Sequence, residues 1–114
     1  MLLAALCALA TQSALAHGKL LSSTPANGSA VATAPAEIRM QFSEPIEIAF
    51  TSVKLLILPE ASEVATLKAR ADKADARAAV VPLPGLASGV YRAQWSTMGH
   101  DGHPVKGEIA FTVK

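Results

Sequence analysis

The sequence predicts a single all-β domain, either a β-sandwich or a β-barrel. The 114-residue chain contains seven glycines and seven prolines, and the runs between these turn residues alternate apolar with polar side chains. Strand-like runs about 8–12 residues apart, with turn signals between them, are typical of sandwiches and barrels. An apolar fraction of 51% argues against disorder, and a net charge of +1 argues against a nucleic-acid-binding protein.

The first segment, Met1–Ala16, is predicted to be a cleaved secretory signal peptide. It is uncharged, and its apolar run ends in the small residues of Ala14–Ala16, which resemble a cleavage site. No Lys or Arg precedes the run, which leaves open a start upstream of Met1 or a weak signal. A buried N-terminal helix is the alternative interpretation. Export predicts a mature domain over residues 17–114 that begins at His17. The only cysteine, Cys7, leaves with the signal, which excludes disulfides and thiolate metal sites from that domain.

Four runs along the mature chain predict strands. Residues 36–43, 89–95 and 105–113 alternate apolar with polar side chains, the period-two pattern of a half-buried strand. Residues 50–58 are nearly continuously apolar and predict a more deeply buried strand. The side chains expected to face the core are Ile38, Met40, Phe42, Tyr91, Ala93, Trp95, Val105, Ile109, Phe111 and Val113.

Residues 60–79 do not follow this pattern. They lack Gly and Pro and are rich in Ala, Lys and Glu, a composition with high helix propensity. Val64, Leu67 and the alanines give only a thin apolar stripe, too weak for a well-packed helix. We expect a variable connection here, with either a short strand at 64–67 or a helical turn.

Asp101 and His103 are the first candidate metal ligands. They are two residues apart, so in extended backbone their side chains point to the same face. A carboxylate and an imidazole together supply part of a borderline metal site. The alternative interpretation is a surface turn in which Asp101 accepts hydrogen bonds from nearby backbone.

His17 is the third candidate, because cleavage after Ala16 would expose its α-amine beside its imidazole. The amine and Nδ1 can close a six-membered chelate ring on one metal ion, and nitrogen-rich tetragonal coordination favours Cu(II). The alternative is a histidine that happens to follow the cleavage site at a frayed terminus. The alternation over residues 19–22 favours a terminus held in a strand.

Several segments of the mature chain occur in a distinctive order. They are His17–Leu20, Ser22–Ser29, Pro35–Ile38, Phe42–Pro45, Gly89–Trp95, Asp101–Gly107 and Phe111–Val113. With a histidine directly after the signal, this order resembles the CopC family of periplasmic copper-binding proteins over nearly the full mature length.

The resemblance implies a seven-stranded Greek-key β-sandwich of cupredoxin-like or immunoglobulin-like type. It also implies one Cu(II) per chain in a histidine brace. The implied ligands are the α-amine and Nδ1 of His17, the imidazole of His103 and the carboxylate of Asp101. Glu44 occupies a position implicated near the Cu(II) in some members, and its alternative interpretation is a solvated residue at a strand end.

The sequence departs from part of the family in its methionines. Some members carry a methionine-rich loop that forms a second, Cu(I)-selective site, whereas residues 53–81 here contain no methionine. Met40 alternates with core residues, and Met98 is expected to be a packing or loop residue. His100 has no family counterpart and is expected to be exposed to solvent. Only the Cu(II) site is therefore expected.

The function that the resemblance implies is a periplasmic Cu(II) carrier or chaperone in copper homeostasis or resistance. It would act as a monomer without catalysis and exchange copper with a CopD-type membrane transporter. Because no transmembrane segment follows before Lys114, we expect a stand-alone soluble form. A histidine-brace oxidative enzyme is one alternative, disfavoured by 4% aromatic residues and by an Asp among the ligands. A metal-free immunoglobulin-like module is another, but it leaves His17 and the Asp101–His103 pair unexplained.

Overall fold

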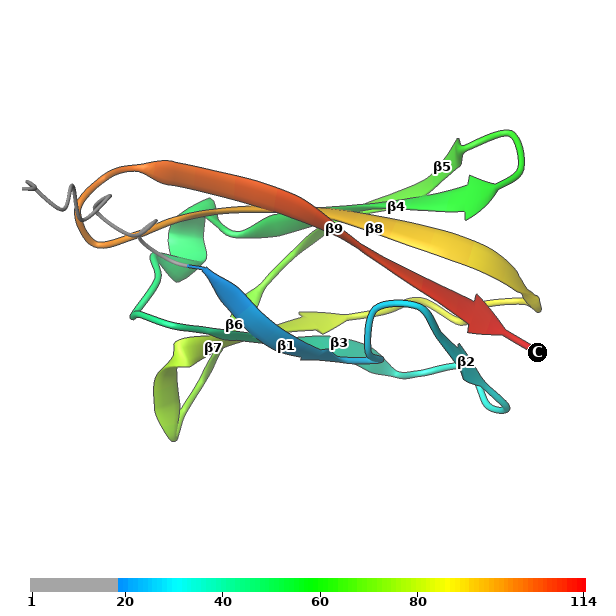
Figure 1. The fold of residues 1–114 in the computed structure, drawn as a ribbon, viewed down its shortest axis with the longest axis horizontal. Coiled ribbons are helices and arrows are strands. Elements are labelled where there is room, and N and C mark those ends of the chain that lie inside the picture. The colour runs from blue at the N-terminus through cyan, green and yellow to red at the C-terminus, as the bar shows by residue number, and fades with distance from the viewer. Residues whose placement is uncertain (1–18) are drawn as a thin grey trace, which may run out of the picture.

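The computed structural model describes residues 19–114, which form a β-sandwich of two sheets (Figure 1). One sheet has the order β1-β3-β7-β6 and the other the order β2-β9-β8-β4-β5. The predicted all-β sandwich is confirmed, while the predicted signal peptide and His17 lie outside the described residues. The strands are β1 (Leu20–Thr24), β2 (Ser29–Val31), β3 (Glu37–Phe42), β4 (Ser52–Leu58), β5 (Ser62–Lys68), β6 (Arg70–Asp72), β7 (Asp75–Pro82), β8 (Gly89–Met98) and β9 (Pro104–Val113).

The strand count exceeds the seven that the family resemblance implies. Two strands of the described residues, β2 and β6, are only three residues long. The other seven have five residues or more. The two short strands extend the edges of the two sheets, so they add to the predicted architecture without changing it. No helix among residues 19–114 is long and apolar enough to cross a membrane.

The core forms where the two sheets face each other, and its residues are those expected from the period-two pattern. All the predicted core side chains except Val105, which is half-buried, are at most 5% exposed. Phe42 from one sheet packs edge-on against Trp95 from the other, with ring centroids 5.4 Å apart. Tyr91 stacks on Phe111 across neighbouring strands at 5.5 Å. Burial of each such side chain contributes about 1.5–3 kcal/mol to the free energy of unfolding.

The fourth predicted strand begins later than its apolar run. Residues Ile48–Phe50 form a one-turn 3-10 helix, η1, and β4 starts at Ser52. Backbone N–H groups of Phe50 and Thr51 donate to the carbonyls of Glu47 and Ile48, which closes the turn. Phe50 is consequently 61% exposed, so the prediction of a buried strand is wrong at this residue. From Ser52 onward it is correct, because β4 lies between β5 and β8.

The interpretation of residues 60–79 as a variable connection is wrong, although the short strand at 64–67 lies within β5. The segment contains β5, β6 and the first part of β7. β5 pairs with β4 in one sheet, and the chain then crosses to the other sheet, where β7 pairs with β6 and β3. Strand pairing satisfies the hydrogen-bonding groups of the backbone and so overrides the helix propensity of these residues. Ala78 and Ala79 are small enough to fit in the buried part of β7.

The longest paired element is the hairpin of β8 and β9. Its ten-residue strands pair without a bulge from Gly89 opposite Val113 to Met98 opposite Pro104. Gly107 stands opposite Trp95, and a Cβ built on Gly107 would lie 2.6 Å from the indole ring. The absence of a side chain at residue 107 therefore makes room for Trp95 in the core.

Two carboxylates hold the β6–β7 turn against the sheet. Arg39 on β3 forms a hydrogen-bonded ion pair with Asp72. This bond, followed by the bond from the Ala74 backbone N–H, lowers the pKa of Asp72 below its usual range. The bond from the Arg77 backbone N–H, followed by the bond from the Gln41 side chain, lowers the pKa of Asp75. Both carboxylates, when ionised, therefore stabilise the folded state relative to the unfolded chain.

Gly107→Ala should destabilise the fold, because the new methyl group would overlap the Trp95 ring. Overpacking of this kind costs about 1–3 kcal/mol, which chemical denaturation with urea would measure. Gly85→Ala is the matched control, since no atom lies within 4 Å of a Cβ at residue 85. Equal stability of the two variants would contradict the assigned role of Gly107.

Asp72→Asn should make the free energy of unfolding depend less on pH in the acid range. A folded-state pKa below the unfolded value of about 3.9 contributes stability that is fully present above that value. This stability is lost as the pH falls through the lower folded pKa. Urea unfolding from neutral pH into this acid range would compare the variant with the parent chain. A parallel loss of stability in both proteins would contradict the prediction.

Candidate metal site at the β8–β9 turn

The candidate site lies on the turn that joins β8 to β9. The N–H of Gly102 donates to the carbonyl of Gly99 at 2.9 Å, and the N–H of Gly99 donates to the carbonyl of His103 at 3.2 Å. Gly102 has a φ of 82°, a left-handed conformation that glycine adopts without the steric cost of a Cβ. The sequence Asp101-Gly102-His103 thus folds locally into a tight reversal.

The turn brings the Asp101 and His103 side chains together. Asp101 Oδ1 accepts a hydrogen bond from the His103 backbone N–H at 3.0 Å, and Asp101 Oδ2 lies 3.2 Å from His103 Nδ1. The surface-turn interpretation is therefore confirmed, since Asp101 accepts a local backbone bond. The two side chains also converge as expected, and their binding of a metal stays a prediction. The route differs from the prediction, because a turn and not an extended strand brings them together. The imidazole is 72% exposed and the carboxylate 30%.

A neighbouring segment holds the base of the turn. Ile46 forms an isolated bridge with Gly99, and the Glu47 N–H donates to the Met98 carbonyl at 2.8 Å. Below them, the buried Thr51 hydroxyl lies 2.7 Å from the Thr97 hydroxyl and also donates to the Glu47 carbonyl. These bonds connect the end of β8 to η1 and fix where the turn leaves the sheet.

His100 is exposed, as the sequence predicts. Its Nε2 lies 3.6 Å from Glu47 Oε1, which makes it a neighbour of the supporting segment. The sequence analysis did not identify Glu47, because its carboxylate is brought to the turn only by the folding of the segment before η1. Met98 is half-buried and Met40 fully buried, which agrees with a packing role for both.

Glu44 and the first described residue lie at this same end of the sandwich. The Ser43 N–H donates to the Lys19 carbonyl at 2.8 Å, and Glu44 is the exposed residue between Ser43 and the Ile46 bridge. The start of β1, η1 and the β8–β9 turn lie toward the same end of the sandwich in Figure 1. Within residues 19–114, no three His, Cys, Asp or Glu side chains form a group able to hold a metal ion, and His17 lies outside this range.

Comparisons with known proteins assign the chain to a family. The family model described as the CopC domain matches residues 20–114. Copper resistance protein C of Pseudomonas syringae pv. tomato is 40% identical over 106 residues, which cover 89% of this chain and 83% of that protein. Copper transport protein CutJ of Bacillus subtilis (strain 168) is 33% identical over 103 residues, 90% of this chain and 19% of that protein.

Solved structures agree with the fold. The crystal structure of CopC from Methylosinus trichosporium OB3b superposes with a TM-score of 0.80 at 28% identity and covers 86% of this chain and 94% of that one. PcoC of Escherichia coli, described as a methionine-rich copper resistance protein, superposes with a TM-score of 0.71 at 37% identity. That match covers 87% of this chain and 100% of PcoC.

Proposed function

Because the chain belongs to the CopC domain family, we propose that it is a periplasmic carrier of one Cu(II) ion in copper homeostasis or resistance. The ion is its cargo, held by a histidine brace. The brace consists of the α-amine and Nδ1 of His17, the His103 imidazole and the Asp101 carboxylate, with Glu44 as a further oxygen donor near the ion. The names of the copper resistance and copper transport relatives support copper as the metal.

The observation that carries this proposal is the convergence of Asp101 and His103. Their Oδ2 and Nδ1 atoms are 3.2 Å apart. Two ligands at about 2.0–2.1 Å from a metal, on adjacent corners of a square, lie about 2.9 Å from each other. The two side chains therefore need only small rotations to enter one coordination sphere. The fixed turn reduces the conformational entropy that binding costs.

Lys19 supports the inclusion of His17. Its hydrogen bond with Ser43 anchors the chain two residues after His17, at the end of the sandwich that carries the turn. His17 is separated from this anchored residue in the sequence only by Gly18. Cleavage after Ala16 makes the His17 nitrogen an amine, which with Nδ1 gives Cu(II) the nitrogen-rich environment that it prefers.

We further propose that the mature domain, residues 17–114, acts as a monomer and exchanges its copper with a CopD-type membrane transporter. The support comes from CutJ of Bacillus subtilis, which is named a copper transport protein and of whose length this chain matches 19%. The proposed role is carriage and not catalysis, in keeping with relatives named for copper resistance and copper transport.

Adding one glycine before His17 should weaken Cu(II) binding at least about a hundredfold, because the amine becomes an amide and the chelate ring is lost. His103→Ala should cause a similar loss, and Asp101→Ala a smaller one. In the parent chain the affinity should fall progressively as the pH is lowered from neutrality, since protons compete with the metal for its nitrogen ligands. Competition titration and electron paramagnetic resonance of chains with a verified first residue would measure these effects.

His100→Ala is the matched control for the brace. It removes an exposed imidazole from the same turn, but one that faces Glu47 and not the Asp101–His103 pair. Its affinity and resonance spectrum should equal those of the parent. Parent-like Cu(II) affinity in the glycine-extended chain would contradict the brace, whatever the substitutions show.

Cu(I) should bind weakly, in contrast to one equivalent of tightly bound Cu(II). Soft thioether ligands select Cu(I), and the methionines of the described residues are Met40, fully buried, and Met98, half-buried on β8. A competing Cu(I) chelator should therefore remove Cu(I) completely, as followed by the absorbance of the chelator complex. Retention of one equivalent of Cu(I) would contradict the prediction, and Met98→Leu would then test whether Met98 holds it.

A further inference from the structure

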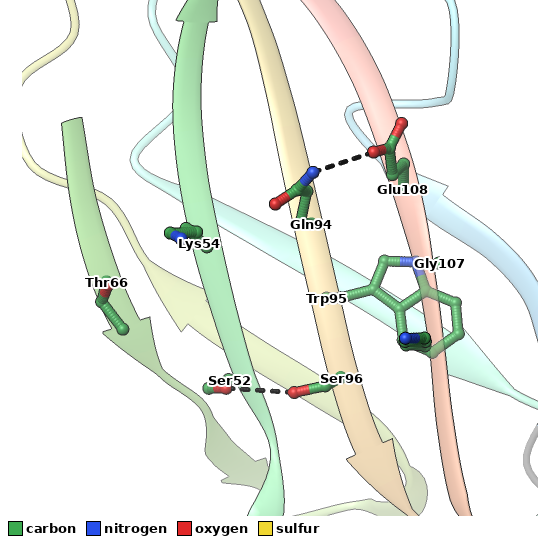
Figure 2. A pocket seen from close by; sticks show the side chains of 9 residues that line it. Ser52, Lys54, Thr66, Gln94, Trp95, Ser96, Gly107 and Glu108 are labelled. Atoms are coloured by element: carbon green, nitrogen blue, oxygen red, sulfur yellow. Dashed lines mark hydrogen bonds between the residues drawn. The ribbon is translucent and has the colours of Figure 1, made fainter. Parts of the chain in front are cut away.

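A hollow of about 780 Å³ lies on the outer face of the five-stranded sheet (Figure 2). Hydroxyl, amide and ammonium groups from four strands line it. The Ser52 and Ser96 hydroxyls lie 3.2 Å apart across β4 and β8. The side chains that matter here are Ser52, Lys54, Thr66, Gln94, Ser96 and Lys106.

Strand register arranges these side chains in two rows across the sheet. In the first row, Lys68 is opposite Ser52, Ser52 is opposite Ser96, and Ser96 is opposite Lys106. In the second row, Lys54 stands between Thr66 and Gln94, and Gln94 is opposite Glu108. With strands about 4.8 Å apart, Lys68 and Lys106 are about 14 Å apart, and the rows are about 7 Å from each other.

The charge in these rows is unbalanced. Among residues 19–114, Lys54, Lys68 and Lys106 form no ion pair. The carboxylate in the rows, Glu108, accepts a hydrogen bond from Gln94 at 3.0 Å and pairs with Arg92 at 3.4 Å. Two ammonium groups, those of Lys54 and Lys106, therefore line the hollow with several hydroxyl donors. Lys68 stands beside it at the end of the first row, so positive charge exceeds the single negative charge of Glu108.

We propose that this hollow is a docking surface for an extended acidic segment of a partner protein. An extended segment with Asp or Glu at alternate positions presents carboxylates on one face about 7 Å and about 14 Å apart. The longer spacing matches that of Lys68 and Lys106, which are about 14 Å apart across the sheet. The hydroxyls on the floor can bond to its backbone or carboxylates. A flat membrane surface fits less well, because it cannot reach the floor of the hollow. Lipid-binding basic clusters also usually have four to eight Lys or Arg residues.

The docking surface lies close to the candidate metal site. Ser96 is two residues before Met98 at the end of β8, and Lys106 is two residues after Pro104 at the start of β9. This places the first row about 7 Å along the strands from the turn. Docking does not require copper binding, but it would bring the partner beside the Asp101–His103 pair and so favour exchange of a metal held there.

A synthetic peptide of alternating Glu and Ser tests the proposal. We expect it to bind the parent chain, to shift the backbone amide resonances of Ser52, Thr66 and Ser96, and to bind more weakly as salt is added. The triple variant K54Q/K68Q/K106Q should lose affinity about tenfold, as expected for three exposed charge pairs. His103→Ala should bind the peptide as the parent does, which separates failure of docking from failure of the copper site.

The matched control is K73Q/R77Q/K114Q, which lowers the net charge equally but leaves the hollow intact. It should keep parent-like affinity, with only the modest change expected from net charge. Equal losses in the two triple variants, or peptide-induced shifts elsewhere on the molecule, would overturn the proposal. So would binding to phosphatidylglycerol vesicles without binding to the peptide, because that result identifies a membrane surface instead.

Discussion

The unbroken pairing of β8 with β9 is the constraint on which the rest of the structure depends. Side chains alternate between faces with a period of two, so a slip of one residue would exchange the faces of a whole strand. In the observed register, Tyr91, Ala93 and Trp95 enter the core and Gln94 and Ser96 face outward. The same register sets where both strands end, and hence where the turn with Asp101 and His103 stands.

Contacts from the rest of the chain make this register unique. In its observed position Trp95 leaves no room for a Cβ on the opposite residue, and Gly107 has none. Phe42 then packs against the indole from the other sheet. At the end of the hairpin, the buried Thr51–Thr97 hydroxyl pair and the bridge between Ile46 and Gly99 connect β8 to the chain before β4. The turn is thus held both by its own strands and by the segment between β3 and β4.

Sequence patterns predicted the parts of the fold in which one face of a strand is buried. Ile38, Met40 and Phe42 were identified because burial on one face produces strict alternation. Residues 60–79 were misread because their edge strands bury little apolar area, so propensity was the stronger local signal. The Asp101–His103 pair was predictable from proximity in sequence. Glu47 near His100 was not, because only tertiary folding brings those two side chains together.

Three different parts of the β8–β9 hairpin carry its core residues, its outer polar residues and its candidate ligands. Its inner face supplies core packing, its outer face carries Lys106, Ser96 and their neighbours, and its turn carries the candidate ligands. Because alternate residues point to opposite faces, outer side chains can change without altering the core, and the turn can change without altering either face. The proposed docking surface can therefore vary independently of the candidate metal site, while the shared register keeps the first row about 7 Å along the strands from the turn.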